Sequence, residues 1–175
     1  MFSASKYYSG VQMVSLPWKE LEKEEPALAR FGSERLDGKV SYLATLRSDG
    51  KPLAHPVTPV IGGGHIFVFL SNDSPRSRDL LENPDFCLHC SMSDSSGSSG
   101  EFQVSGMALK VDSPDLRSQA ESFSSFRPSI RSWLFELFVS NVMSTTYRGG
   151  RPRRFRWTAT EKEMEQIIID IENKE

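Results

Sequence analysis

The chain has few cysteines, no long apolar run and little excess charge. Cys87 and Cys90 are the two cysteines of its 175 residues, too few for a disulfide framework, which favours a reducing compartment. No segment approaches the roughly 20 apolar residues of a membrane span, and the first ten residues lack the apolar core of a secretory signal. The net charge of -2 gives no general attraction to nucleic acid or anionic membrane. We therefore expect a cytoplasmic protein without nucleic-acid or membrane partners.

What the sequence does contain is enough for one folded domain. Its hydrophobic content of 38% and charged content of 25% are ordinary for a globular protein, and its length suits a single core. We expect a flexible N-terminal arm over residues 1–15, a folded domain over 16–158 and an amphipathic helix over 159–175. The apolar face of that last helix needs a partner, either the domain or a second subunit.

A predicted β-hairpin opens the best-patterned region. Two β-rich runs, Val40–Arg47 and Leu53–Ile61, flank Ser48-Asp49-Gly50-Lys51, and Asp-Gly in this position is the strongest short-range hairpin signal. Pro56 and Pro59 cannot donate to a strand ladder, so the second strand is irregular, bulged or at an edge. Its backbone groups are therefore available to a planar ligand.

Strands and short helices account for most of the remaining pattern. Residues 91–100 read as a flexible Gly/Ser loop, and Gly106 marks a bulge or a close approach. The expected helices are Trp18–Lys23, Pro26–Leu36, a short one opening at Ser74, and Ser113–Ser125; the expected strands are His65–Ser71, Phe86–Ser91, Glu101–Val111 and Trp133–Val139 continuing toward Met143–Tyr147.

The strongest local signal lies where a strand ends and a helix begins. Hydroxyl groups and two cations gather in Ser71-Asn72-Asp73-Ser74-Pro75-Arg76-Ser77-Arg78. A helix N-terminus exposes unpaired amides and a positive dipole end, which favour an anion such as phosphate. An arginine adds a charge-assisted contact. Ser74 is also a good simple N-cap, so a phosphate site and an ordinary cap both remain open.

Ser74, Arg76, Leu80 and Asn83-Pro84 match a step found in a known family. On these residues the chain resembles the pyridoxamine 5'-phosphate oxidase-like FMN-binding split-barrel family, in which the serine and the basic residue hold the phosphate of flavin mononucleotide (FMN). The resemblance implies a mainly β fold with flanking helices, a six-stranded antiparallel split β-barrel. It also implies a homodimer with FMN at the interface and a small-molecule substrate for an FMN-dependent oxidoreductase.

The second strand departs from the oxidase proper. The oxidases carry Arg-x-Val-Leu-Leu-Lys there, whereas this chain has His55-Pro56-Val57-Thr58-Pro59-Val60, which is similar to the broader flavin-binding relatives. By this resemblance, His55, Val57 and Thr58 would line the flavin ring and ribityl chain. Ser71, Ser74 and Arg76 would bind the phosphate. No catalytic side chain and no metal site are predicted.

Three alternatives to an FMN oxidoreductase remain open. One is a deazaflavin-dependent reductase on the same fold. Another is a haem-handling relative in which His55, His65 or His89 ligates iron. The third is a non-enzymatic flavin-binding module.

Two further motifs are ambiguous in the sequence. Cys87 and Cys90 have zinc-like spacing, but they alternate in a predicted strand and no second pair exists, so we expect buried cysteines. The segment 147–157 interleaves arginines with aromatic residues, a pattern that can bind nucleic acid. We instead expect it to form a wall of the flavin or substrate pocket across a dimer.

Overall fold

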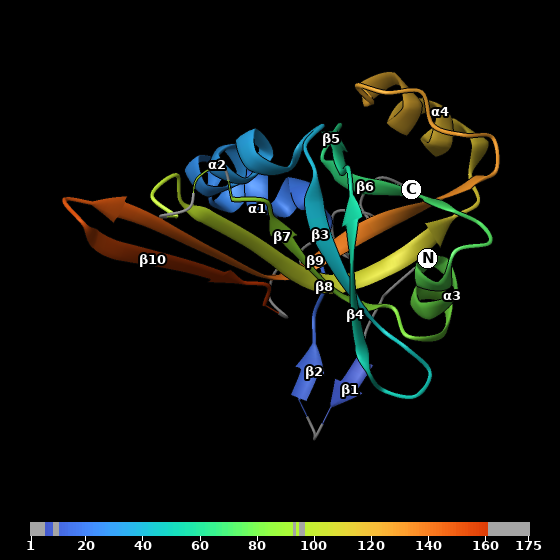
Figure 1. The fold of residues 1–175 in the computed structure, drawn as a ribbon, viewed down its shortest axis with the longest axis horizontal. Coiled ribbons are helices and arrows are strands. Elements are labelled where there is room, and N and C mark those ends of the chain that lie inside the picture. Colours follow the sequence, from blue (N-terminus) through green and yellow to red (C-terminus); the bar gives the residue numbers. More distant parts are fainter. Residues whose placement is uncertain (1–5, 9–10, 93, 95–96, 161–175) are drawn as a thin grey trace, which may run out of the picture.

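The computed structural model of the chain describes residues 6–8, 11–92, 94 and 97–160. The predicted C-terminal helix lies almost entirely outside the described residues. Figure 1 shows one twisted sheet with helices around it and a small hairpin to one side. The helices are α1 (Trp18–Glu24), α2 (Pro26–Leu36), α3 (Pro75–Glu82) and α4 (Pro114–Phe123); the strands are β1 (Lys6–Tyr8), β2 (Val11–Met13), β3 (Ser41–Leu46), β4 (Pro52–Val57), β5 (Val60–Gly62), β6 (His65–Ser71), β7 (Asp85–Cys90), β8 (Glu101–Val111), β9 (Ser132–Arg148) and β10 (Arg151–Thr158).

The main sheet is antiparallel and has eight strands in the order β4-β3-β7-β8-β9-β6-β5, with β10 added to β9. The prediction of a six-stranded split barrel was therefore wrong in strand count, and hydrogen bonds among the described strands do not close the sheet. Two residues, Thr58 and Pro59, connect the two outermost strands of this order, β4 and β5. The ends of the sheet thus meet through the chain itself, although no ladder joins them.

The extra strands have identifiable physical causes. The predicted strand Leu53–Ile61 divides at Thr58-Pro59, because the proline has no N–H for a ladder, and its two halves pair with β3 and β6. The arginine-rich segment after Tyr147 forms β10, which pairs with the second half of β9. The predicted hairpin is confirmed: β3 pairs with β4 in register, and Gly50 in its turn has a φ of 77°.

The core lies on the face of β3 that carries its hydroxyl groups. Ser41, Leu43 and Thr45 are buried, and their register partners on β7 are the buried Cys90, Leu88 and Phe86. The opposite face carries Val40 and Tyr42, which are 51% and 50% exposed. The more apolar face of this strand is therefore the open one.

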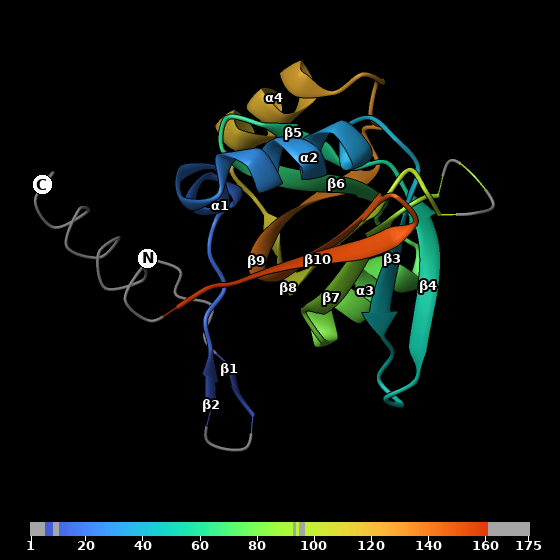
Figure 2. The ribbon, with the colours of Figure 1, turned by 90° about the vertical axis from the view of Figure 1, so that its left-hand side faces the viewer.

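Helices cover the sheet unevenly. In Figures 1 and 2, α1 and α2 lie together at one end, α3 lies against the β3 side and α4 lies over β5 and β6. The predicted irregularity at Gly106 is confirmed by a register shift between β8 and β9. An added Cβ there would lie 1.9 Å from the Phe138 carbonyl oxygen, so only glycine fits.

Strands β9 and β10 form a long hairpin that extends away from the body of the sheet (Figure 1). Its turn is Gly149-Gly150, both with positive φ. Trp157 anchors its base: the ring is 7% exposed, and its Nε1 donates to Glu24 Oε2 at 2.7 Å. Among the described residues, no helix is long and apolar enough to cross a bilayer.

Candidate functional site

The turn from β6 into α3 is built from serine hydroxyls. Ser74 is the N-cap of α3, since its Oγ accepts from the Ser77 N–H at 3.3 Å, with Pro75 in the first helical position. The Ser77 hydroxyl donates to the Ser71 carbonyl at 2.6 Å. The sequence-predicted cap is confirmed, and the helix start is fixed to the end of the strand.

Arg76 links this turn to the edge strand β4. Its Nη1 donates to the Pro56 carbonyl at 2.8 Å. Pro56 stands between His55 and Val57, so the contact joins the two stretches that the resemblance singled out. The remaining guanidinium nitrogens of Arg76 form no ion pair with an acidic group of the described residues, which leaves donors for an anion.

His55 presents an unsatisfied polar atom beside this contact. Its register partner is the fully buried Leu43, so its ring points to the core face. The ring as a whole is half-exposed, yet its Nε2 atom is buried and has no hydrogen-bond partner in the described structure. Burial and the nearby charge of Arg76 lower the pKa of His55, against an opposing effect of Asp79. A neutral imidazole with one orphaned nitrogen therefore faces the interior, an arrangement that a ligand atom would satisfy.

The other predicted site residues differ in accessibility. Val57 is 8% exposed and packs in the core, so its backbone is the part nearest to any ligand. Thr58 is half-buried in the link between β4 and β5. The exposed Ser71 directs its hydroxyl to the Asp73 carboxylate, a bond that lowers the pKa of Asp73. The contact between Arg76 and the Pro56 carbonyl brings Ser74 and Arg76 close to His55 and Val57, while the Ser71 hydroxyl turns toward a neighbouring acid.

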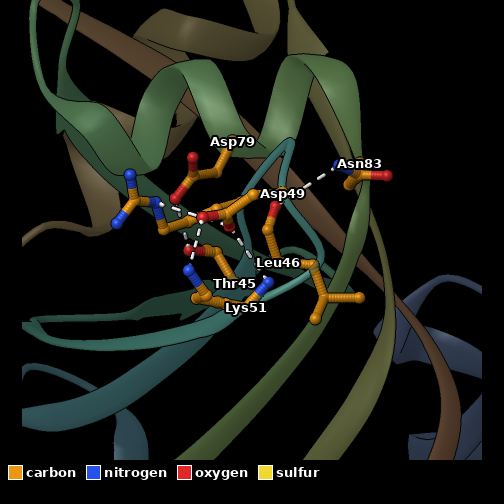
Figure 3. A network of polar contacts seen from close by, with 7 residues as sticks. Thr45, Leu46, Asp49, Lys51, Asp79 and Asn83 are labelled. Atoms are coloured by element: carbon orange, nitrogen blue, oxygen red, sulfur yellow. Dashed lines mark hydrogen bonds and ion pairs between the residues drawn. The ribbon is translucent and has the colours of Figure 1, made fainter.

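Sequence reasoning missed a buried contact that fastens α3 to the β3–β4 hairpin. Figure 3 shows the helix above the hairpin, with Thr45 Oγ1 donating to Asp79 Oδ2 at 2.9 Å. Asp79 is 9% exposed and Thr45 is 2% exposed. At the far end of the helix, the Asn83 side chain donates to the Leu46 carbonyl at 3.4 Å. The sequence did contain one signal for this contact. Asp79 directly precedes the apolar Leu80 in the predicted short helix, and both are buried in α3.

The Asp-Gly turn below this helix carries its own small charge network. Asp49 Oδ2 lies 3.3 Å from Lys51 Nζ (Figure 3). The backbone N–H of Lys51, and after it the Lys51 ammonium group, lower the pKa of the exposed Asp49. The Lys51 N–H also donates to Asp49 Oδ1 at 3.2 Å. Because the group is fully solvated, we assign it to turn geometry and not to the ligand site.

The cysteine and histidine pattern shows no metal site. Side chains alternate along β7 as predicted, with Cys87 half-buried and Cys90 buried; burial raises the pKa of the Cys87 thiol. Cys90 Sγ accepts from the Phe102 N–H at 3.2 Å. His89 Nδ1 lies 2.6 Å from the Cys90 carbonyl oxygen. Within the described ranges, no group of three or more His, Cys, Asp or Glu side chains could hold a metal ion.

No family model matches the sequence, and no curated protein matches it. Solved structures do match. A heme-binding protein from Mycobacterium smegmatis is 21% identical with a TM-score of 0.61, covering 75% of this chain and 56% of that chain. A pyridoxamine 5'-phosphate oxidase-related, FMN-binding protein from Nostoc punctiforme is 10% identical with a TM-score of 0.60, covering 81% and 92%. An F420 reductase is 15% identical with a TM-score of 0.50, covering 63% and 94%.

These similarities concern the fold, because every identity is below 25%. The chain spans a little over half the length of the heme-binding protein and most of the length of the other two. The expected mainly β architecture with flanking helices is confirmed at this level. The protein has the fold of the pyridoxamine 5'-phosphate oxidase-like, FMN-binding proteins.

Proposed function

We propose that this protein is an FMN-binding flavoprotein, a cytoplasmic oxidoreductase for a small molecule. The observation that carries the proposal is the corner where the orphaned Nε2 of His55 lies beside the contact between Arg76 and Pro56. A ligand suited to this corner has an anionic end for the arginine and a planar polar group for the histidine and the strand backbone. FMN has both, and the similar Nostoc protein is FMN-binding by description.

The phosphate of FMN would bind at the start of α3. The free donors of Arg76 and the first amides of the helix would bind it, and the Ser74 hydroxyl would turn to it from Ser77 Oγ, 2.8 Å away. Ser71 would join them by turning its hydroxyl from Asp73 to the phosphate. The carboxylate of Asp73 would then face bulk solvent, where an exposed aspartate is well hydrated.

The ring and ribityl chain of FMN would lie along β4 and its link to β5. His55 would satisfy its Nε2 on a polar atom of the flavin, and Val57 and Thr58 would contribute backbone and side-chain contacts. When bound, the flavin would supply the redox chemistry, while the protein binds, orients and shields it from water. No protein side chain is given a catalytic role.

A second copy of the chain would complete the assembly. The open face of β3 presents Val40 and Tyr42, and the register places Tyr42 opposite Pro56 and His89 on the same face. An exposed apolar sheet face next to the cofactor corner favours a two-fold dimer that covers it and duplicates the site.

The experiment that tests this function is a visible absorbance spectrum of the purified protein before and after addition of FMN, followed by acid release of the bound ligand. A yellow, two-banded spectrum that acid releases as FMN supports the proposal. A colourless protein that does not respond to FMN contradicts it. Binding of a deazaflavin with no binding of FMN would move the assignment to the deazaflavin reductases, to which the F420 reductase neighbour belongs by name.

Haem is the second candidate, because an unpartnered imidazole nitrogen is also a possible iron ligand. His55 is the histidine best placed for it. His65 and His89 already contact Glu136 and the Cys90 carbonyl through Nδ1. A sharp Soret band that disappears in His55→Ala would favour haem over flavin.

A further inference from the structure

A pocket away from the cofactor corner is lined by residues at the end of β8, on β9 and at the start of α4. Figure 1 shows where β8 leads into α4. The pocket has a volume of about 340 Å³, within the range of small-molecule sites. Its lining includes four apolar residues, Leu109, Val111, Leu116 and Phe138, and the acidic residue Glu136. This combination resembles a ligand site more than a packing defect, because packing voids are apolar throughout.

Glu136 is buried in an apolar layer. It is 6% exposed, and its register partners are the fully buried Phe67 on β6 and the half-buried Leu109 on β8. These partners place its side chain on the sheet face that α4 covers. A carboxylate in such surroundings loses hydration and requires compensation from hydrogen bonds or an opposite charge.

His65 compensates one of the two carboxylate oxygens. Its Nδ1 lies 2.6 Å from Glu136 Oε1, and its ring stacks on Phe67 with centroids 5.3 Å apart. This arrangement fixes the orientation of the carboxylate. Glu136 Oε2 makes no hydrogen bond within the described ranges, and Glu136 is among the residues that line the pocket.

The one lysine in the pocket lining does not neutralise Glu136. Lys110 Nζ pairs with the exposed Asp112 and lies 5.3 Å from the Trp133 ring centroid. An opposite charge brought in by a ligand would act on Glu136 in apolar surroundings, where Coulomb interactions are stronger than in water.

We propose that this pocket binds a small ligand with an apolar body and a cationic amino group, with Glu136 Oε2 as the acceptor. Leu109, Leu116 and Phe138 would contact the apolar body. His65 is a positioning residue that holds Oε1. The proposal is independent of flavin binding, since the pocket shares no residue with the cofactor corner.

The first test compares two probes of nearly equal shape on the full chain. 2-Phenylethylamine carries the cation, and 2-phenylethanol is its uncharged counterpart. We expect protein-observed NMR titration at pH 7 to give about tenfold tighter binding of the amine, as for a charge-assisted hydrogen bond. Equal affinity for the two probes, or no binding of either, would overturn the proposal without bearing on FMN.

The second test uses Glu136→Gln, which keeps the size of the side chain and a carbonyl oxygen for His65. The preference for the amine should disappear while the affinity for the alcohol stays within about twofold. Asp112→Asn is the matched control, because it removes a charge at the rim, and it should keep the preference. A preference retained in Glu136→Gln would contradict the assignment.

A third variant covers the case in which Glu136→Gln does not fold. Leu116→Trp enlarges a half-buried wall residue on α4 without touching Glu136. It should weaken both probes by about tenfold or more through steric exclusion. Unchanged binding of both probes would place them elsewhere and refute the pocket. In each variant the FMN absorbance titration should match that of the unchanged chain.

Discussion

Arginine appears in two very different settings in this molecule. Arg76 is half-buried and donates at 2.8 Å to the backbone of β4. The β9–β10 hairpin carries five exposed arginines whose side chains form no ion pair or hydrogen bond among the described residues: Arg148, Arg151, Arg153, Arg154 and Arg156. An oriented cation at a helix start loses little entropy when it binds an anion, whereas a solvated one must first be ordered. Position in the fold, more than residue type, separates a candidate ligand from a charged surface.

The largest expected effect comes from removing the oriented arginine. Arg76→Ala should weaken FMN binding by about 10- to 100-fold, since it removes a charge-assisted hydrogen bond. Arg154→Ala is the matched control and should change the affinity by less than about threefold. Flavin fluorescence titration measures both. An equal loss of FMN affinity in the two variants would contradict the distinction between Arg76 and the hairpin arginines. It would support the sequence-based expectation that the hairpin lines the pocket of a second subunit.

The next effect separates capping from phosphate binding. Ser74 and Ser113 are both N-caps, accepting from the Ser77 and Leu116 N–H groups at 3.3 Å. Replacing either with alanine should lower the free energy of unfolding by about 1 kcal/mol, as urea denaturation would show. Only Ser74→Ala should also weaken FMN binding. If it leaves FMN affinity unchanged, Ser74 is a cap and nothing more.

A smaller effect is expected in the pH dependence of stability. Because the folded state lowers the pKa of His55, the unfolded chain binds the proton more readily. The stabilisation from the neutral ring is therefore complete above the ordinary histidine pKa of about 6.5 and is lost as the pH falls below it. Urea denaturation at pH 7.5 and 5.5 should show a smaller loss in His55→Gln than in the unchanged chain. Arg76→Ala should also reduce the loss, and Arg154→Ala should not; identical losses in all four proteins would contradict the role of His55.

The smallest effect is expected on the hairpin. Arg151→Ser and Arg153→Ser should each change the free energy of unfolding by less than about 0.5 kcal/mol, because both side chains are exposed and unpaired within the described part of the chain. Thermal unfolding monitored by circular dichroism measures this. A larger loss would mean that the hairpin arginines are ordered by contacts with a second copy.

The sequence predicted the local features well and the long-range ones poorly. The Asp-Gly hairpin, the Ser74 cap and the irregularity at Gly106 depend on neighbouring residues, and all three are confirmed. Strand β10 was not predicted, because arginines on both faces hide the alternation that marks a strand. The exposure of Val40 and Tyr42 was also not predicted, because apolar residues that alternate along a strand are usually assigned to its buried face.

The same division applies to the candidate site. Family-like spacing placed His55 and Arg76 in one site, and the Pro56 contact brings them to one corner. The orphaned Nε2 of His55 and the bond between Thr45 and Asp79 depend on how α3 docks on the sheet, and that bond joins residues 34 positions apart. No local pattern encodes that docking. The binding roles themselves stay predictions until a ligand is measured.

The position of β4 has a consequence for self-association. A bare sheet edge can recruit a strand from another molecule and start aggregation. Strand β4 has Pro52 at its start and Pro56 near its end, and Arg76 occupies the Pro56 carbonyl, so a foreign strand finds few free hydrogen-bonding groups there. The free side of β10 has one proline in eight residues and a row of like charges instead. The β4 edge is thus protected by geometry and the free side of β10 by electrostatic repulsion, a protection that added salt would weaken.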